Sequence, residues 1–185
     1  MPLIDRTVEP VLKALAGQYP VVTITGPRQS GKTTLCRKVF PAKPYANLEA
    51  PDVRQFALED PRGFLAQYPE GAVLDEIQRA PDLVSYLQPL VDEDQREGLF
   101  ILTGSQQFEV SDTISQSLAG RTALVRLLPF SQSEIQGRFT LPPVDGLLYH
   151  GFYPRLWDKQ LNPTQALGDY VQTYIERDLR QLVAV

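Results

Sequence analysis

The sequence predicts an α/β fold with a mostly parallel β-sheet, because short apolar strand patterns alternate with helical patterns along the chain. Several of these apolar runs end in glycine, carboxylate or hydroxyl residues. In an open sheet of this kind, ligands bind at the carboxyl ends of the strands. The expected strands are residues 19–25, 45–48, 72–74, 99–103 and 122–128.

Helix patterns separate these strands, and two of them begin with recognisable capping residues. Asp60 precedes Pro61, a combination typical of an N-cap followed by the first helical residue. Ser131 and Glu134 have the spacing of a capping box. The expected helices are residues 7–16, 32–39, two short helices within 50–69, 83–94, 111–119, one after Ser131, and 169–185.

Composition restricts the class of protein. The chain has 185 residues, of which 43% are hydrophobic and 22% are charged, as in ordinary globular domains. Its formal net charge of -4 gives no general attraction to nucleic acid. One cysteine, Cys36, and one histidine, His150, provide neither an internal disulfide nor a typical zinc site. With no signal peptide and no apolar run long enough to span a membrane, we expect a cytoplasmic protein.

The clearest motif is GPRQSGKT, which fills every fixed position of the phosphate-binding pattern G-x-x-x-x-G-K-[ST]. A predicted strand precedes it and a predicted helix follows. Glycines allow the backbone N–H groups to face an anion, Lys32 supplies a compact positive charge, and the Thr33 hydroxyl is a ligand for Mg²⁺. The expected nucleotide-binding residues are Gly26, Pro27, Arg28, Gln29, Ser30, Gly31, Lys32, Thr33 and Thr34.

Two carboxylates follow the apolar residues 72–74. Asp75 is expected to hold Mg²⁺ together with Thr33. Glu76 is the candidate general base for an attacking water. The plainer interpretation is a strand that leads into a solvated acidic turn.

A third strand, residues 99–103, leads into small polar residues. Ser105, Gln106 and Thr103, in that order, are candidates to orient the water against the γ-phosphate. The alternative is an ordinary strand-to-helix turn in which Ser105 is an N-cap.

These signals together resemble AAA-type ATPases. The closer likeness is to a bacterial and archaeal group of AAA-like ATPases that carry an uncharacterised, nuclease-like C-terminal domain. The stretches that carry the likeness span nearly the whole chain and are TGPRQSGKTTL, VLDEIQRAPDL, FILTGSQ, SLAGRTALVRLLPFSQSE, GFYPRL and YIERDL.

The resemblance implies a three-layer P-loop NTPase sandwich with strand order 5-1-4-3-2, and residues 103–106 as a sensor segment. It implies an arginine finger at Arg121, which would act on a neighbouring subunit of a homo-oligomer. It also implies a small helical lid that starts at residues 151–154 and places Pro154 beside the adenine. Phe152 stands where the family usually has a second glycine. We expect residues 1–137 to form the ATPase core and residues 138–185 a linker and a partial lid. The nuclease-like domain is absent, so the chain resembles the front part of a longer protein.

Several residues keep two interpretations. Arg28 is a candidate contact to phosphate or to a neighbouring subunit, or a solvated charge. Arg6 is a candidate neighbour of the nucleotide base. Arg121 is a finger, or it pairs with an acidic residue on the surface.

Proteins of three functional classes would contain such a phosphate loop. One is an ATP-driven, oligomeric machine that remodels DNA or protein, with DNA bound through the absent domain. Another is a slow nucleotide-gated switch that controls an attached effector domain. A small-molecule kinase is less favoured because the sequence shows no cluster of lid arginines. The sequence does not separate machine from switch, or ATP from GTP. It predicts ATP and Mg²⁺ as ligands and no membrane partner.

Overall fold

The computed structural model describes residues 3–105 and 117–175. The chain divides into two compact units. The sheet unit comprises Thr7–Pro27 and Gly31–Leu128. The C-terminal unit comprises Met1–Arg6, Arg28–Ser30 and Pro129–Val185. The division of function between residues 1–137 and 138–185 stays a prediction.

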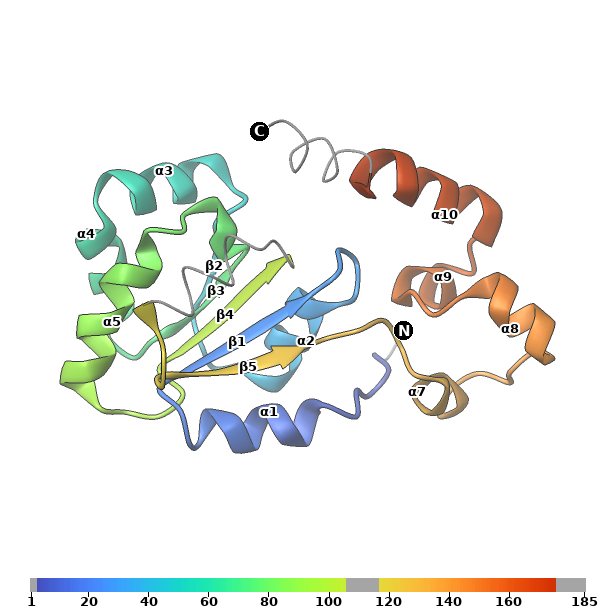
Figure 1. Cartoon of the computed structure of the whole chain (residues 1–185), viewed down its shortest axis with the longest axis horizontal. Helices are drawn as coiled ribbons and strands as arrows, with labels where there is room; N and C mark the ends of the chain where they lie inside the picture. The colour runs from blue at the N-terminus through green and yellow to red at the C-terminus, as the bar shows by residue number, and fades with distance from the viewer. Residues whose placement is uncertain (1–2, 106–116, 176–185) are drawn as a thin grey trace. The chain divides into compact units, whose positions relative to one another are not determined.

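The sheet unit is built on five parallel strands in the order β2-β3-β4-β1-β5 (Figure 1). Read from the other edge, this is the predicted order 5-1-4-3-2, so the α/β P-loop NTPase fold is confirmed. In the register of the ladder, Gly26 pairs with Ser105 and Asn47 pairs with Asp75. The polar ends of the strands therefore lie at one edge of the sheet. The strands are β1 (Val21–Gly26), β2 (Tyr45–Asn47), β3 (Ala72–Asp75), β4 (Phe100–Ser105) and β5 (Thr122–Arg126).

Helices cover both faces of this sheet, which makes three layers. On one face pack α1 (Glu9–Ala16) and α2 (Lys32–Val39), through side chains such as Leu12 and Leu35. The other face is covered by α3 (Pro51–Glu59), α4 (Pro61–Ala66) and α5 (Leu83–Asp94). As predicted, the Asp60 side chain caps α4 by accepting from the backbone N–H of Gly63.

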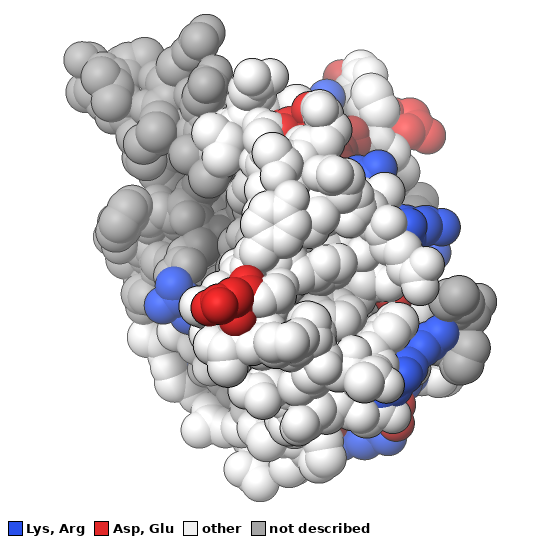
Figure 2. Space-filling model, turned by 90° about the vertical axis from the view of Figure 1, so that its right-hand side faces the viewer, with Lys and Arg blue, Asp and Glu red and all other residues white. Residues whose placement is uncertain are grey.

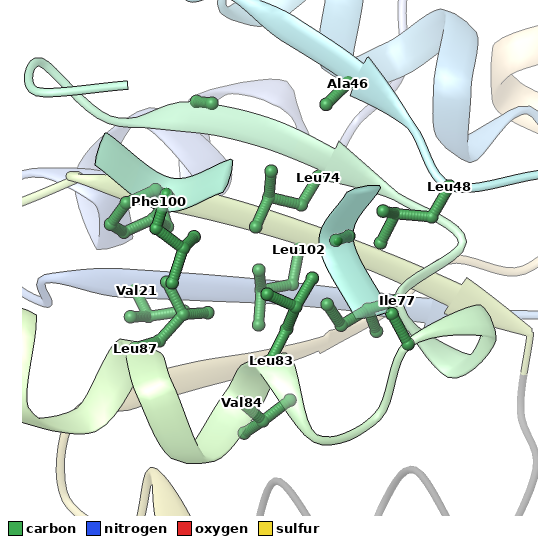
Figure 3. Close-up of a cluster of buried hydrophobic side chains, with 14 of the residues drawn as sticks. Val21, Ala46, Leu48, Leu74, Ile77, Leu83, Val84, Leu87, Phe100 and Leu102 are labelled. Carbon is green, nitrogen blue, oxygen red and sulfur yellow. The ribbon is translucent and has the colours of Figure 1, made fainter. Parts of the chain in front are cut away.

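Alternate side chains of each central strand enter opposite layers. Phe100 and Leu102 of β4 pack with Leu87 of α5, whereas Ile101 belongs to the core on the α1 and α2 face. Figure 3 shows Leu83, Val84 and Leu87 of α5 beneath the strands. Each fully buried Leu or Phe stabilises the fold by about 1.5–3 kcal/mol relative to an exposed one. Burial on both faces explains why these strands read as continuous apolar runs.

The C-terminal unit is a group of short helices around a separate apolar core that includes Ile135, Leu156 and Trp157. The predicted capping box is present: Ser131 accepts from the Glu134 N–H, and the Glu134 carboxylate accepts from the Ser131 N–H. The helices are α7 (Gln132–Gln136), α8 (Val144–His150), α9 (Pro154–Lys159) and α10 (Pro163–Tyr170), and a π-helical turn, Val171–Ile175, follows.

The last helix begins earlier than predicted. The sequence pattern places its start at residue 169, but α10 begins at Pro163, where Asn162 caps it by accepting from the Gln165 N–H. Helices α8 and α9 have no clear sequence pattern, because exposed apolar side chains such as Leu148 blur the helical period. Residues 106–116 and 176–185, which hold most of the expected helix 111–119 and the end of the last one, lie outside the described residues. Within the described residues, no helix combines the length and the apolar character needed to cross a bilayer.

Candidate nucleotide-binding site

The loop between β1 and α2 has the backbone of an anion-binding nest. Gly26 and Gly31 have φ values of 151° and 96°, and Gln29 has φ 61°. A left-handed angle at Gln29, which has a side chain, costs on the order of 1 kcal/mol and is a sign of a functionally constrained loop. Gly31 is also the N-cap of α2, so the loop lies at the positive end of an eight-residue helix.

Lys32, the first residue of α2, directs its side chain back over this loop. Its ammonium donates to the carbonyl oxygens of Gly26 and Pro27, both at 3.0 Å. The residue is only 5% exposed. A positive charge held against the loop in this way is placed to contact the oxygens of a bound polyphosphate.

Asp75, at the end of β3, is the centre of a hydroxyl cluster and is 3% exposed. Its Oδ2 accepts from the Thr33 hydroxyl at 2.8 Å and from the Tyr45 hydroxyl, and its Oδ1 accepts from the Thr103 hydroxyl. Burial, and then the hydrogen bond to Asp75, raise the pKa of Tyr45 above its ordinary value. Residues from α2, β2, β3 and β4 therefore converge on one carboxylate.

This donor set fits a magnesium ion bound jointly with phosphate. In the described part of the chain, no group of three or more His, Cys, Asp or Glu side chains is placed to hold a metal ion by itself. Mg²⁺ usually takes one or two protein carboxylates and completes its shell with water and substrate phosphates. Thr33 and Asp75, joined by their hydrogen bond, offer one hydroxyl and one carboxylate. They are the residues that would hold the ion.

Glu76 follows Asp75 in a left-handed conformation, with φ 62° and ψ 48°. Its N–H donates to the Thr103 hydroxyl at 3.2 Å. Its carboxylate accepts from the side-chain amide of Gln78, which also donates to the Ser105 hydroxyl at 3.0 Å. The structure thus brings together the predicted base and the first-ranked sensor residue.

Gln78 was missed by the sequence analysis. It lies in the short 3₁₀ helix η1 (Ile77–Arg79) that follows Glu76. A Cβ on Gly104 would come within 2.8 Å of the Gln78 amide oxygen, so the small residue leaves room for this side chain beside β4. A polar side chain two residues after a candidate base was the available signal. Gln106, the remaining sensor candidate, lies outside the described residues.

Arg121 lies at the other end of the sheet from the phosphate loop. Its neighbour Thr122 pairs with Val21, the first residue of β1, whereas the loop begins at the last. Its guanidinium binds the Asp92 carboxylate through two hydrogen bonds of 2.5 and 2.8 Å. These bonds raise the pKa of Arg121 and lower that of Asp92 from their ordinary values. Both groups face solvent, where such a pair adds little stability. Arg121 is therefore remote from the phosphate loop of its own chain.

Pro154 and Arg6 belong to the C-terminal unit. Pro154 is the first residue of α9, and its neighbours Tyr153 and Arg155 line a cavity of about 560 Å³ that Gln29 also lines. Arg6 is buried and donates to the backbone carbonyl of Ser30 at 3.0 Å. Its proposed place beside a nucleotide base stays a prediction.

Comparison with known proteins identifies the family. Residues 18–136, which include the phosphate loop and the Asp75 cluster, match a family described as an AAA domain. The chain belongs to this family of P-loop ATPase domains.

Two relatives share the likeness. The chain is 36% identical over 174 residues to uncharacterized proteins of Mycobacterium tuberculosis and Mycobacterium bovis. The matched region covers 92% of this chain and 38% of each relative.

Solved structures agree on the fold. The Walker-type ATPase of Pyrococcus abyssi is similar with a TM-score of 0.63 and 16% identity, over 98% of this chain and 76% of that one. DnaA of Aquifex aeolicus, bound to AMPPCP, is similar with a TM-score of 0.56 and 18% identity, over 96% of this chain and 66% of that one. The nuclease-like domain predicted beyond this chain gains no support from these similarities.

The site makes one prediction about pH. Burial raises the pKa of the Cys36 thiol, in α2, from 9.0 to about 12; Asp75 adds to the rise and Lys32 opposes it. The unfolded chain therefore loses this proton first as pH rises. The stability that the folded protein gains from keeping this thiol protonated is complete below pH 9.0 and is lost progressively up to about pH 12.

We expect wild-type protein to lose about 1.4 kcal/mol more unfolding free energy than Cys36→Ala between about pH 8 and pH 10. Urea unfolding at both pH values measures this difference. Equal losses in the two proteins would show that the folded thiol titrates normally.

Proposed function

We propose that this chain binds ATP with Mg²⁺ and hydrolyses it. The observation that carries the proposal is the 2.8 Å hydrogen bond between Thr33 and Asp75. It links the hydroxyl that follows the phosphate-loop lysine to a buried carboxylate at the end of β3. A glycine-rich loop that matched the motif by chance would not be expected to lie beside such a carboxylate. Mg²⁺-dependent P-loop enzymes, in contrast, need both the hydroxyl and the carboxylate to bind the ion.

Each residue then has a task that its position suits. The loop N–H groups and Lys32 bind the β- and γ-phosphates. Thr33 and Asp75 would hold Mg²⁺, and the ion would supply positive charge to the phosphate oxygens. Glu76 accepts a proton from the attacking water, and Ser105 orients that water. The Gln78 amide, which donates to both side chains, fixes where the Glu76 carboxylate lies. Pro154, beside the cavity of the C-terminal unit, is the proposed contact to the adenine side of the nucleotide.

We further propose that turnover drives remodelling of DNA or protein by an oligomer. Arg121 supports this proposal, because it directly precedes edge strand β5, at the end of the sheet away from its own phosphate loop. The Arg121 guanidinium could bind the phosphate of a nucleotide in a neighbouring subunit after its hydrogen bonds to Asp92 are broken. Figure 2 shows a face on which uncharged surface predominates and Lys and Arg side chains are scattered. We therefore assign any DNA contact to regions outside this face, and this chain on its own is expected to bind DNA weakly.

The two carboxylates are predicted to separate binding from chemistry. Glu76→Gln keeps the size and the hydrogen bonding of the side chain but removes the base, so hydrolysis should fall about 10²- to 10⁴-fold with ATP affinity retained. Asp75→Ala should weaken Mg²⁺-dependent binding as well, because it removes a metal ligand. Steady-state phosphate release and calorimetric titration with Mg²⁺-ATP measure the two effects.

Glu97→Gln, the same change at an exposed position, is the matched control and should behave as wild type. Normal hydrolysis by Glu76→Gln would remove Glu76 from the role of base. Unchanged Mg²⁺-ATP affinity in Asp75→Ala would contradict the metal assignment.

The arginine finger makes a different prediction. Arg121→Ala should bind ATP normally and lose turnover, and specific activity of the wild type should rise with protein concentration. Mixing Arg121→Ala with Glu76→Gln should restore part of the activity, because mixed assemblies contain composite sites with one intact base and one intact finger. A finger supplied in trans is worth about 10³–10⁵ in rate.

Arg126→Ala, at an exposed arginine that ends strand β5, is the control and should keep full activity. If mixing restores nothing and activity is independent of concentration, Arg121 is a structural partner of Asp92.

A further inference from the structure

Three residues of the phosphate loop pack with the C-terminal unit. Arg28–Ser30 group with Met1–Arg6 and Pro129–Val185, while the loop's flanking residues group with the sheet. Two side chains of the C-terminal unit, Arg6 and Tyr170, hydrogen-bond to carbonyl oxygens of this short segment. Both side chains bind backbone atoms of the loop, so they can influence the backbone conformation of the loop.

Arg6 is buried and makes several contacts at once. It is 8% exposed, and its guanidinium lies 4.9 Å from the centre of the Phe130 ring. Its three nitrogens donate in three directions, to Glu134 at 3.2 Å, to the Pro129 carbonyl at 3.2 Å and to the Ser30 carbonyl at 3.0 Å. Because the guanidinium fork is planar, fixing two nitrogens also fixes the direction of the third.

Tyr170, the last residue of α10, contacts the loop two residues earlier. Its hydroxyl donates to the Arg28 carbonyl at 3.3 Å and accepts from the Tyr153 hydroxyl at 3.2 Å. The rings of Tyr153 and Tyr170 pack with their centres 4.8 Å apart. The Arg28 guanidinium in turn lies 5.4 Å from the centre of the Tyr174 ring.

Peptide geometry turns these contacts into control of the N–H groups. A trans peptide is planar, and its C=O and N–H point in opposite directions. When Arg6 holds the Ser30 carbonyl on one side, the Gly31 N–H must point to the other. Tyr170 fixes the Gln29 N–H in the same way through the Arg28 carbonyl. Gln29 itself has the unfavourable φ of 61°, which such contacts help to maintain.

We propose that Arg6 and Tyr170 are positioning residues for the phosphate loop. They hold the carbonyls of Ser30 and Arg28 away from the nest and thereby direct two backbone N–H groups toward the nucleotide's phosphates. Neither side chain needs to touch the nucleotide. The inference rests on the proposed ATP binding and adds that the affinity for phosphate depends on the C-terminal unit.

Tripolyphosphate, a ligand that has phosphates but no adenine, tests this mechanism. If Arg6 acts through the loop, its loss weakens Mg²⁺-tripolyphosphate and Mg²⁺-ATP by the same factor, because both present phosphates to the loop. If Arg6 instead borders the base, its loss weakens ATP and leaves tripolyphosphate unchanged. Calorimetric titration of each variant with both ligands separates the two roles.

We expect Arg6→Met to weaken both ligands about tenfold or more, and Arg6→Lys, which keeps one donor for the Ser30 carbonyl, to recover part of this loss. Tyr170→Phe removes one hydroxyl and should weaken both about threefold, with KM raised and kcat unchanged. The matched control is Tyr149→Phe, whose hydroxyl hydrogen-bonds to Thr164 at 2.7 Å and not to the loop, and which should bind as wild type.

The outcomes are distinct. Wild-type affinity for both ligands in Tyr170→Phe and Arg6→Lys would overturn the inference, and so would a loss confined to ATP. Because Tyr170→Phe deletes a single oxygen, it remains a test even if Arg6→Met does not fold. Failure of the wild type to bind either ligand would instead overturn the proposed function.

Discussion

The burial of Asp75 is the constraint on which the rest of the site depends. A carboxylate that is removed from water must receive hydrogen bonds, and here three hydroxyls from three other elements supply them. This requirement ties α2 to β3 through Thr33, and β4 to β3 through Thr103. It therefore fixes the phosphate loop, which leads into α2, relative to strand β3, which Glu76 follows. The residues proposed to hold a metal and a phosphate are therefore brought together by the hydrogen bonds of one buried acid.

The parallel sheet explains why these groups meet. In a parallel sheet the carboxyl ends of the strands share an edge, and the pairing of Gly26 with Ser105 places β1 and β4 in register there. The apolar cores on both faces hold the strands, and the polar chemistry begins where those cores stop. Gln29 and Glu76, two of the left-handed non-glycine residues, lie at this boundary, and such strained angles persist only where the surrounding structure holds the backbone.

Sequence patterns predicted the features of the structure that depend on residues close together in the chain. The buried strands, the Asp60 cap and the Ser131–Glu134 capping box depend on residues close in sequence, and all are present. Pairing of Arg121 with an acidic surface residue was one of its two predicted interpretations. The position of Gln78, the contact of Arg6 with Ser30 and the identity of Asp92 as the partner of Arg121 were not predicted. The last two join residues 24 and 29 positions apart, through surfaces that exist only after the chain has folded. The start of α10 was misplaced because an Asn cap before a proline was overlooked.

The central claim is that the loop and Lys32 bind a nucleotide, and ligand-induced stabilisation tests it most directly. At 100 times its dissociation constant, Mg²⁺-ATP should add about 2.7 kcal/mol to the unfolding free energy and raise the melting temperature of the wild type. Lys32→Ala should remove this shift, whereas Lys13→Ala, at an exposed position on α1, should keep it. A well-folded wild type whose melting curve is unchanged by millimolar Mg²⁺-ATP would contradict the account.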